Sequence, residues 1–166
     1  MTTPAIALPA APRKPNVGAR HLHMWSPHTG DNLKTTFWEN GRYIDSALSE
    51  IDWFMRDCRE DMVISIDIRV INILASLQSR LGTQEPLQLL SGYRSPKTNA
   101  FLRASSSSVS PRSLHMVGKA ADITISDRTL DEIIRSAAAS GAGGIGRYAG
   151  SNFVHLDCGR PRRWEG

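Results

Sequence analysis

A single acidic residue, Asp122, interrupts the apolar segment AADITI at positions 120–125. The neighbours of Asp122 are small or branched apolar residues, so the segment predicts a strand that lies in the core. A carboxylate on such a strand is costly unless a partner compensates its charge. The fold must therefore bring a cation or hydrogen-bond donors to Asp122, and Arg94 in SGYRS is a candidate for an ordinary buried ion pair.

The rest of the chain combines segments of helical spacing with short strand-like segments. Helices are predicted over 45–58, 67–81, 96–104 and 129–140, and strands over 87–93, 120–125, 143–148 and 152–157. Gly82 and Gly141 are natural helix stops, and Asp127 is a candidate cap for the last helix. This order predicts an α+β fold with a mostly antiparallel sheet flanked by helices.

The N-terminal region predicts an arm followed by a hairpin. Residues 1–20 are rich in Ala and Pro, and their segment AIALPAAP is short for a signal core and is broken by Pro9. We therefore interpret 1–20 as a flexible arm and 21–166 as one domain that begins with two strands, HLHMW and LKTTFW. A chain of 166 residues suits a single domain. No apolar run reaches the ~18 residues that predict a membrane span.

Charge and cysteine content exclude some classes of partner and site. The formal net charge of +4 and the pI of about 9.4 fit either a solvated basic surface or attraction to a polyanion such as the cell wall. No zinc finger, RRM signature or basic helix supports nucleic-acid binding. The run Arg160, Arg162 and Arg163 is a candidate local anion contact. Cys58 and Cys158 lack CxxC spacing, so they predict no structural zinc or redox motif, and whether they pair stays open.

Two histidines accompany Asp122 in the last third of the chain. His115 stands in SLHMVGKAAD, and His155 stands in NFVHLDC on the last predicted strand. Two imidazoles and one carboxylate form a ligand set that suits zinc and leaves a fourth position for water, whereas a lone strand histidine is otherwise an ordinary structural residue. Gly118 lets the backbone turn between the loop and the strand. Strand alternation places Asp157 on the face of His155, as a partner of that ligand, a proton acceptor or an anchor for substrate.

Two other patterns predict no cofactor or metal site. The GAGGIG run follows a predicted helix instead of opening one, so it does not fit a dinucleotide-binding loop. His21 and His23 alternate on one strand face, but no carboxylate or third histidine accompanies them nearby. We interpret both as structural or surface residues.

Three segments in this order, SGYRSPKTNAFLR, SLHMVGKAADI and FVHLDCGRPRRW, resemble the YcbK-like murein endopeptidases. These enzymes belong to the zinc D-Ala-D-Ala carboxypeptidase (LAS metallopeptidase) superfamily. The resemblance covers residues 20–166 and implies one Zn²⁺ held by His115, Asp122 and His155. It also implies that Arg94 faces the site and helps to hold substrate or the developing oxyanion.

The activity that the resemblance implies is hydrolysis of peptide cross-links in peptidoglycan by metal-activated water, in the periplasm or cell envelope. A D-alanyl-D-alanine carboxypeptidase and a non-catalytic zinc-containing module that binds the cell wall are the alternatives. Ser113 would position the loop of His115. Many superfamily members carry a general base three positions before the last ligand, but that position is Asn152 here, so Asp157 becomes the first candidate base. No export signal is visible, which leaves association with a secretion apparatus open.

Overall fold

The computed structural model describes residues 18–166, and the predicted arm at 1–20 lies outside this range except for its last three residues. One eight-stranded sheet has the order β3-β2-β1-β4-β5-β7-β6-β8. Its strands are β1 (Arg20–Trp25), β2 (Asn32–Glu39), β3 (Arg42–Tyr43), β4 (Leu87–Ser91), β5 (Ala120–Thr124), β6 (Gly144–Tyr148), β7 (Phe153–Asp157) and β8 (Arg162–Glu165). Neighbouring strands are antiparallel except for the pairs β1–β4 and β6–β8. The predicted α+β class with a mostly antiparallel sheet is confirmed.

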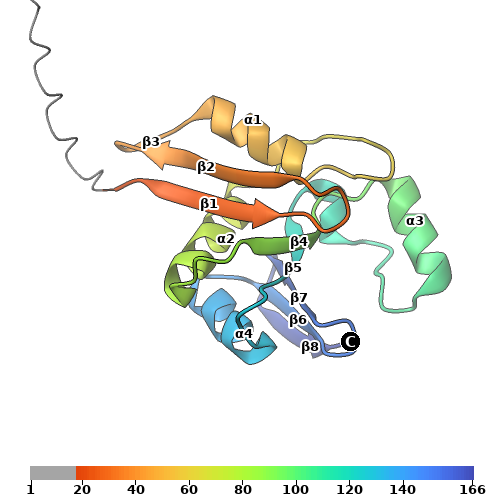
Figure 1. The fold of residues 1–166 in the computed structure, drawn as a ribbon. Helices are drawn as coiled ribbons and strands as arrows, with labels where there is room; N and C mark the ends of the chain where they lie inside the picture. Colours follow the sequence, from red (N-terminus) through yellow and green to blue (C-terminus); the bar gives the residue numbers. More distant parts are fainter. Residues whose placement is uncertain (1–17) are drawn as a thin grey trace, which may run out of the picture.

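Four α-helices and one short 3-10 helix accompany the sheet. They are α1 (Asp45–Phe54), α2 (Ile68–Leu81), α3 (Pro96–Ser105), η1 (Leu114–Val117) and α4 (Leu130–Ala139). Helices α2 and α4 pack against each other, α1 packs on β2, and α3 lies on the far side of the molecule from α2 and α4 (Figure 1). Among the helices in the described range, none is long and apolar enough to cross a bilayer.

The core forms where the sheet meets α1, α2 and α4. Helix α2 illustrates why these elements form: Asp67 caps its first turn by accepting from the Arg69 N–H, and Gly82 ends it with a left-handed φ of 58°. The face between these ends is apolar and buries Val70, Ile71, Ile73, Leu74, Ala75 and Leu77. The predicted helix over 67–81 and its stop at Gly82 are therefore confirmed.

Two predicted helix ends were wrong. Helix α1 stops at Phe54 and not at 58, because the chain turns to meet the segment after β4, where the Tyr93 N–H donates to the Met55 carbonyl at 2.8 Å. Asp127 does not cap α4. Thr129 caps it in a reciprocal box with Glu132, while the Asp127 carboxylate accepts from the Thr83 hydroxyl at 2.9 Å.

The structure confirms the predicted hairpin, shows the state of both cysteines and adds one strand. Strands β1 and β2 pair from Arg20 opposite Trp38 to Trp25 opposite Asn32, which confirms the hairpin. Cys58 is exposed and Cys158 is half-buried, and both are free thiols. Strand β8 had no counterpart among the predicted elements, and it completes the sheet beyond β6.

Candidate active site

Three side chains from separate elements converge on the sheet. His115 comes from η1, and Asp122 and His155 come from β5 and β7, where they stand directly opposite each other in the antiparallel register. The His155 Nδ1 lies 2.8 Å from Asp122 Oδ1 and 3.1 Å from His115 Nε2. The His115 Nε2 lies 3.2 Å from the same carboxylate oxygen. All three residues are buried, so the predicted ligand set forms one compact cluster.

The segment around η1 is shaped to bring His115 to the sheet. Ser113 begins η1, and its hydroxyl accepts from the His115 N–H, as the resemblance implied. Gly118 ends η1 with φ of 64°, in the left-handed region. A Cβ at Gly118 would lie 2.8 Å from the Ser65 carbonyl oxygen, so only glycine fits both the conformation and the close approach. The chain then enters β5, which carries Asp122.

Hydrogen bonds on the outer nitrogens fix both imidazole rings. The His115 Nδ1 lies 2.7 Å from the Gly92 carbonyl oxygen, which only accepts, so Nδ1 carries the proton. The His155 Nε2 lies 3.0 Å from an oxygen of the Asp157 carboxylate, so Nε2 carries the proton there. Each ring then turns an unprotonated nitrogen toward Asp122 Oδ1. Such outer partners are typical of histidines that bind metals.

The donor set fits a small cation. When both imidazoles are neutral, three lone-pair atoms face one another with no proton between them, an arrangement that repels unless positive charge lies at its centre. Tetrahedral zinc with bonds of about 2.0–2.1 Å separates its ligand atoms by about 3.3 Å. The three separations of 2.8, 3.1 and 3.2 Å are close to that edge length. His115, Asp122 and His155 are therefore suited to hold a zinc-sized ion.

Charge around the cluster favours an ionised Asp122. Burial opposes ionisation of this carboxyl, yet the charge and hydrogen bonds of His115, with those of His155 and Arg94, hold its pKa well below the usual range. The Arg94 guanidinium pairs with the second oxygen, Oδ2, and its Nε donates to the Ser91 hydroxyl at 2.7 Å. Arg94 thus forms the buried pair considered from the sequence, and it also lines the cleft above the cluster.

The pKa values of the two imidazoles are shifted in opposite directions. Burial lowers the pKa of His115 below its ordinary value. Burial also favours a neutral His155, but hydrogen bonds with Asp122 and Asp157 outweigh it and raise the pKa of this ring. Among the three candidate donors, His155 is therefore the one that binds a proton most readily.

Asp157 lies beneath His155 and is fully buried. One oxygen accepts from the backbone N–H of Gly144 at 3.1 Å and of Gly159 at 2.8 Å, and the other faces His155 Nε2. Arg162 donates to both oxygens, at 3.1 and 2.5 Å. Burial raises the pKa of Asp157, but the hydrogen bonds from His155 and Arg162 outweigh it and leave the pKa below its usual range. Asp157 is thus an ionised partner of His155.

Two glycines of β6 let β8 reach these residues. Across the sheet, Gly146 lies between His155 on β7 and Trp164 on β8, and Gly144 lies in the same way between Asp157 and Arg162. A Cβ at Gly144 would lie 2.6 Å from the Arg162 guanidinium, and a Cβ at Gly146 would lie 2.6 Å from the Trp164 indole nitrogen. Both β8 side chains therefore fold over a glycine to contact β7. The sequence prediction missed this support, and the alternate glycines of GGIG are the signal that could have indicated it.

A cleft of about 790 Å³ opens above the cluster. Its lining includes the three converging residues, Arg94, the serine-rich segment after α3 and an aromatic group formed by Tyr148, Phe153 and Trp164. A second hollow of about 220 Å³ shares Arg94, Asp122 and Phe153 with it and extends to the turn after β1.

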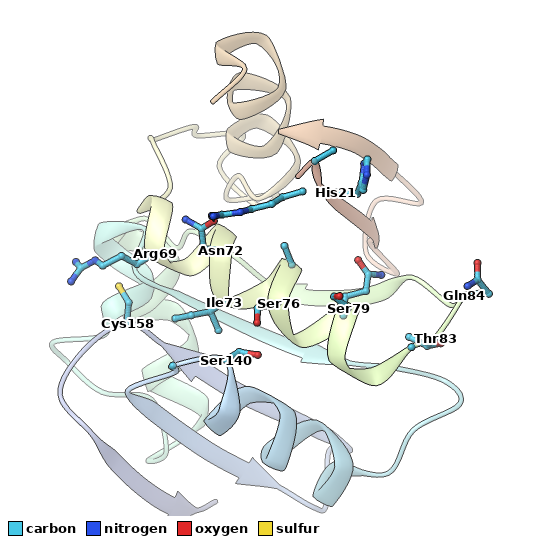
Figure 2. A pocket seen from close by; sticks show the side chains of 16 residues that line it. His21, Arg69, Asn72, Ile73, Ser76, Ser79, Thr83, Gln84, Ser140 and Cys158 are labelled. Carbon is cyan, nitrogen blue, oxygen red and sulfur yellow. The ribbon is translucent and has the colours of Figure 1, made fainter. Parts of the chain in front are cut away.

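A larger hollow of about 1000 Å³ lies elsewhere. Figure 2 shows it along α2, with His21, Arg69, Ser140 and Cys158 among its lining residues. It shares no residue with the cleft, and its lining holds no carboxylate and none of the three converging side chains. The cleft above the cluster is therefore the candidate active site.

Comparisons with known proteins identify the family of this chain. The family model Peptidase_M15_2, described as peptidoglycan L,D-endopeptidase MepK, matches residues 14–164. Peptidoglycan L,D-endopeptidase MepK of Escherichia coli is 41% identical over 164 residues, which cover 99% of this chain and 87% of that protein. The probable peptidoglycan L,D-endopeptidase MepK of Haemophilus influenzae is 34% identical over 140 residues, covering 84% of this chain and 75% of that protein. The resemblance to the YcbK-like murein endopeptidases is confirmed: this chain belongs to the MepK family of peptidases.

Proposed function

We propose that the protein is a zinc-dependent peptidoglycan endopeptidase that hydrolyses an internal L,D peptide bond. The observation that carries the proposal is the convergence of three metal-donor atoms on the floor of an open cleft, in a chain of this peptidase family. The named activity of the relatives from Escherichia coli and Haemophilus influenzae supports the choice of substrate.

His115, Asp122 and His155 would hold the zinc ion through Nε2, Oδ1 and Nδ1, the atoms that face one another. Zinc in such a site acidifies a water molecule and polarises a carbonyl group. Asp157 keeps the His155 ring in the tautomer that presents Nδ1. Gly92 fixes the tautomer of His115 in the same way through its carbonyl oxygen.

Arg94 supplies positive charge at the edge of the cleft. Its Nε and Nη2 are engaged by Ser91 and Asp122, whereas its Nη1 has no hydrogen-bond partner among the described residues. That N–H group remains available to a carbonyl or carboxylate oxygen of the substrate. The pair with Asp122 holds the guanidinium in place, so little entropy is lost when substrate binds.

The shape of the site favours an endopeptidase over a carboxypeptidase. The two hollows meet at Arg94, Asp122 and Phe153, so substrate chain has room on both sides of the cluster. A carboxypeptidase needs only a short pocket for one terminal residue. We also propose that the protein acts in the periplasm, because its proposed substrate, peptidoglycan, lies there.

The proposal is tested by digestion of purified sacculi. We expect the zinc-loaded protein to release peptide fragments whose masses identify a cut between an L and a D centre, and we expect a chelator to stop the reaction until zinc is restored. His155→Ala should be inactive, whereas His21→Ala, a change at an exposed histidine on β1, should be active.

The outcomes separate the alternatives. Release of terminal D-alanine alone would indicate a carboxypeptidase. Binding to sacculi without any product would indicate a wall-binding module. Either result would reject the proposed endopeptidase.

A further inference from the structure

The cleft-facing side chains of the sheet stand in transverse rows. We call Asp122, His155, Gly146 and Trp164, which are cross-strand neighbours on β5, β7, β6 and β8, the metal row. Tyr148 stands opposite Phe153 in the next row. This row lies two residues along β6 from the metal row, a spacing of about 7 Å. The two rings stack with centroids 4.4 Å apart and an interplanar angle of 9°. This stack holds the Tyr148 ring rigidly at the wall of the cleft.

The hydroxyl of Tyr148 reaches back into the metal row. The Trp164 Nε1–H donates to it at 3.1 Å. That indole nitrogen lies over Gly146, only 2.6 Å from where a Cβ would stand, and the Trp164 ring packs 5.2 Å from the His155 ring. The Trp164 ring therefore links the Tyr148 hydroxyl to His155, whereas Arg94 pairs with Asp122 on β5.

The direction of this hydrogen bond leaves the hydroxyl hydrogen of Tyr148 available to donate. An indole N–H only donates, so the Tyr148 oxygen must accept, and its own O–H must point elsewhere. No described residue accepts from that O–H, and Tyr148 lines the cleft. The group is half-buried, and it is oriented before substrate arrives.

The cleft is otherwise poor in groups that handle protons. Asp122 is the one carboxylate side chain among the residues that line its main hollow, and it belongs to the metal-donor set. Asn152 is exposed in the turn between β6 and β7, with φ of 52°, and does not line either hollow of the site. Asp157 lies beneath His155 and not in the cleft.

We propose that Tyr148 is a catalytic residue of the hydrolysis proposed above, on which this inference rests. Its O–H donates a hydrogen bond to the oxygen of the scissile carbonyl, and this bond strengthens as negative charge develops there. The proton stays on Tyr148 throughout, so the step needs no partner base. Arg94 and Tyr148, which both line the cleft, then both donate to the reacting carbonyl.

The experiment compares Tyr148→Phe with the wild type on cross-linked muropeptides. The phenylalanine keeps the stack on Phe153 and removes only the hydroxyl. We expect kcat to fall about 10²-fold with little change in KM, as for the loss of one oxyanion donor. Zinc affinity should be unchanged. Tyr43→Phe is the matched control, because its hydroxyl accepts from the Asn72 amide on the surface, remote from the cleft.

Binding of inhibitors separates a catalytic from a structural tyrosine. A phosphinate analogue of the scissile bond carries the charge of the transition state, whereas a reduced-amide analogue has no such oxygen. Tyr148→Phe should bind the phosphinate about 10²-fold more weakly and the reduced amide as tightly as the wild type. Equal losses for both analogues, a loss of zinc affinity, or an unchanged kcat would each overturn the assignment. An inactive wild type would overturn the proposed function itself and this inference with it.

Discussion

Substitution of Asp157 by asparagine tests how the metal centre is held. In the structure, three N–H donors from Gly144, Gly159 and Arg162 point at one oxygen of Asp157, while His155 and Arg162 face the other. In Asp157→Asn the amide oxygen must take the three-donor side, so the NH₂ group faces His155 Nε2. An NH₂ group only donates, so the ring must accept and its proton moves to Nδ1, the atom assigned to zinc.

The magnitude follows from that tautomer change. Zinc binding would force the proton back to Nε2, where it would meet another donor, and one buried donor unsatisfied costs about 1–3 kcal/mol. A loss of this size corresponds to roughly 10–100-fold in zinc affinity, the range typical for outer partners of metal-bound histidines. Since the defect lies in affinity, excess zinc should restore the rate.

The assay titrates zinc against a fluorescent chelator and measures the rate at saturating zinc. Asp127→Asn, at a carboxylate that bonds Thr83 far from the cleft, is the matched control and should behave as wild type. If Asp157→Asn binds zinc normally but stays about 10²–10⁴-fold slow when saturated, Asp157 is a proton acceptor and our reasoning is refuted. Wild-type values for both quantities would leave Asp157 with neither role.

Three further predictions follow from the same contacts. Arg94→Ala should retain zinc, which itself compensates Asp122, but lose about 3 kcal/mol of transition-state stabilisation, seen as a fall in kcat/KM at full zinc occupancy. Gly146→Ala should displace the Trp164 indole and destabilise the fold by about 1–3 kcal/mol, which urea unfolding followed by tryptophan fluorescence would measure. Zinc affinity should weaken as the pH falls through the raised pKa of His155, because burial of that ring is outweighed by hydrogen bonds to two carboxylates and protons then compete for Nδ1; calorimetric titrations at several pH values check this.

Local patterns predicted most of the elements and three side chains that the structure brings together. Asp122 within an apolar strand required partners, and the structure supplies Arg94 and two histidines. The chemistry of Asp122 is readable because a buried charge is costly anywhere in a fold. Gly82 likewise marked the end of α2 because a left-handed residue is a local requirement.

Long-range pairings were not readable in the same way. Strand β8 pairs parallel to β6, and its sequence RRWE looked like part of a basic run and not like a strand. Arg162 does contact an anion, but the anion is Asp157 of the same chain. Helix α1 ended early because of a contact with the segment at Tyr93, which no local pattern around residue 55 indicates.

The position of β8 at the edge of the sheet has a consequence for how firmly the proposed zinc ion would be retained. Edge strands are the parts of a sheet that open most readily, and this one carries Trp164 and Arg162, which steady His155 and its carboxylate partner. Separation of β8 from β6 and dissociation of zinc are then coupled equilibria. If zinc binds more tightly when β8 is paired with β6, then bound zinc must stabilise that pairing by the same free energy. Amide hydrogen exchange in Arg162–Glu165 should therefore slow on zinc loading, even though none of these residues belongs to the candidate donor set.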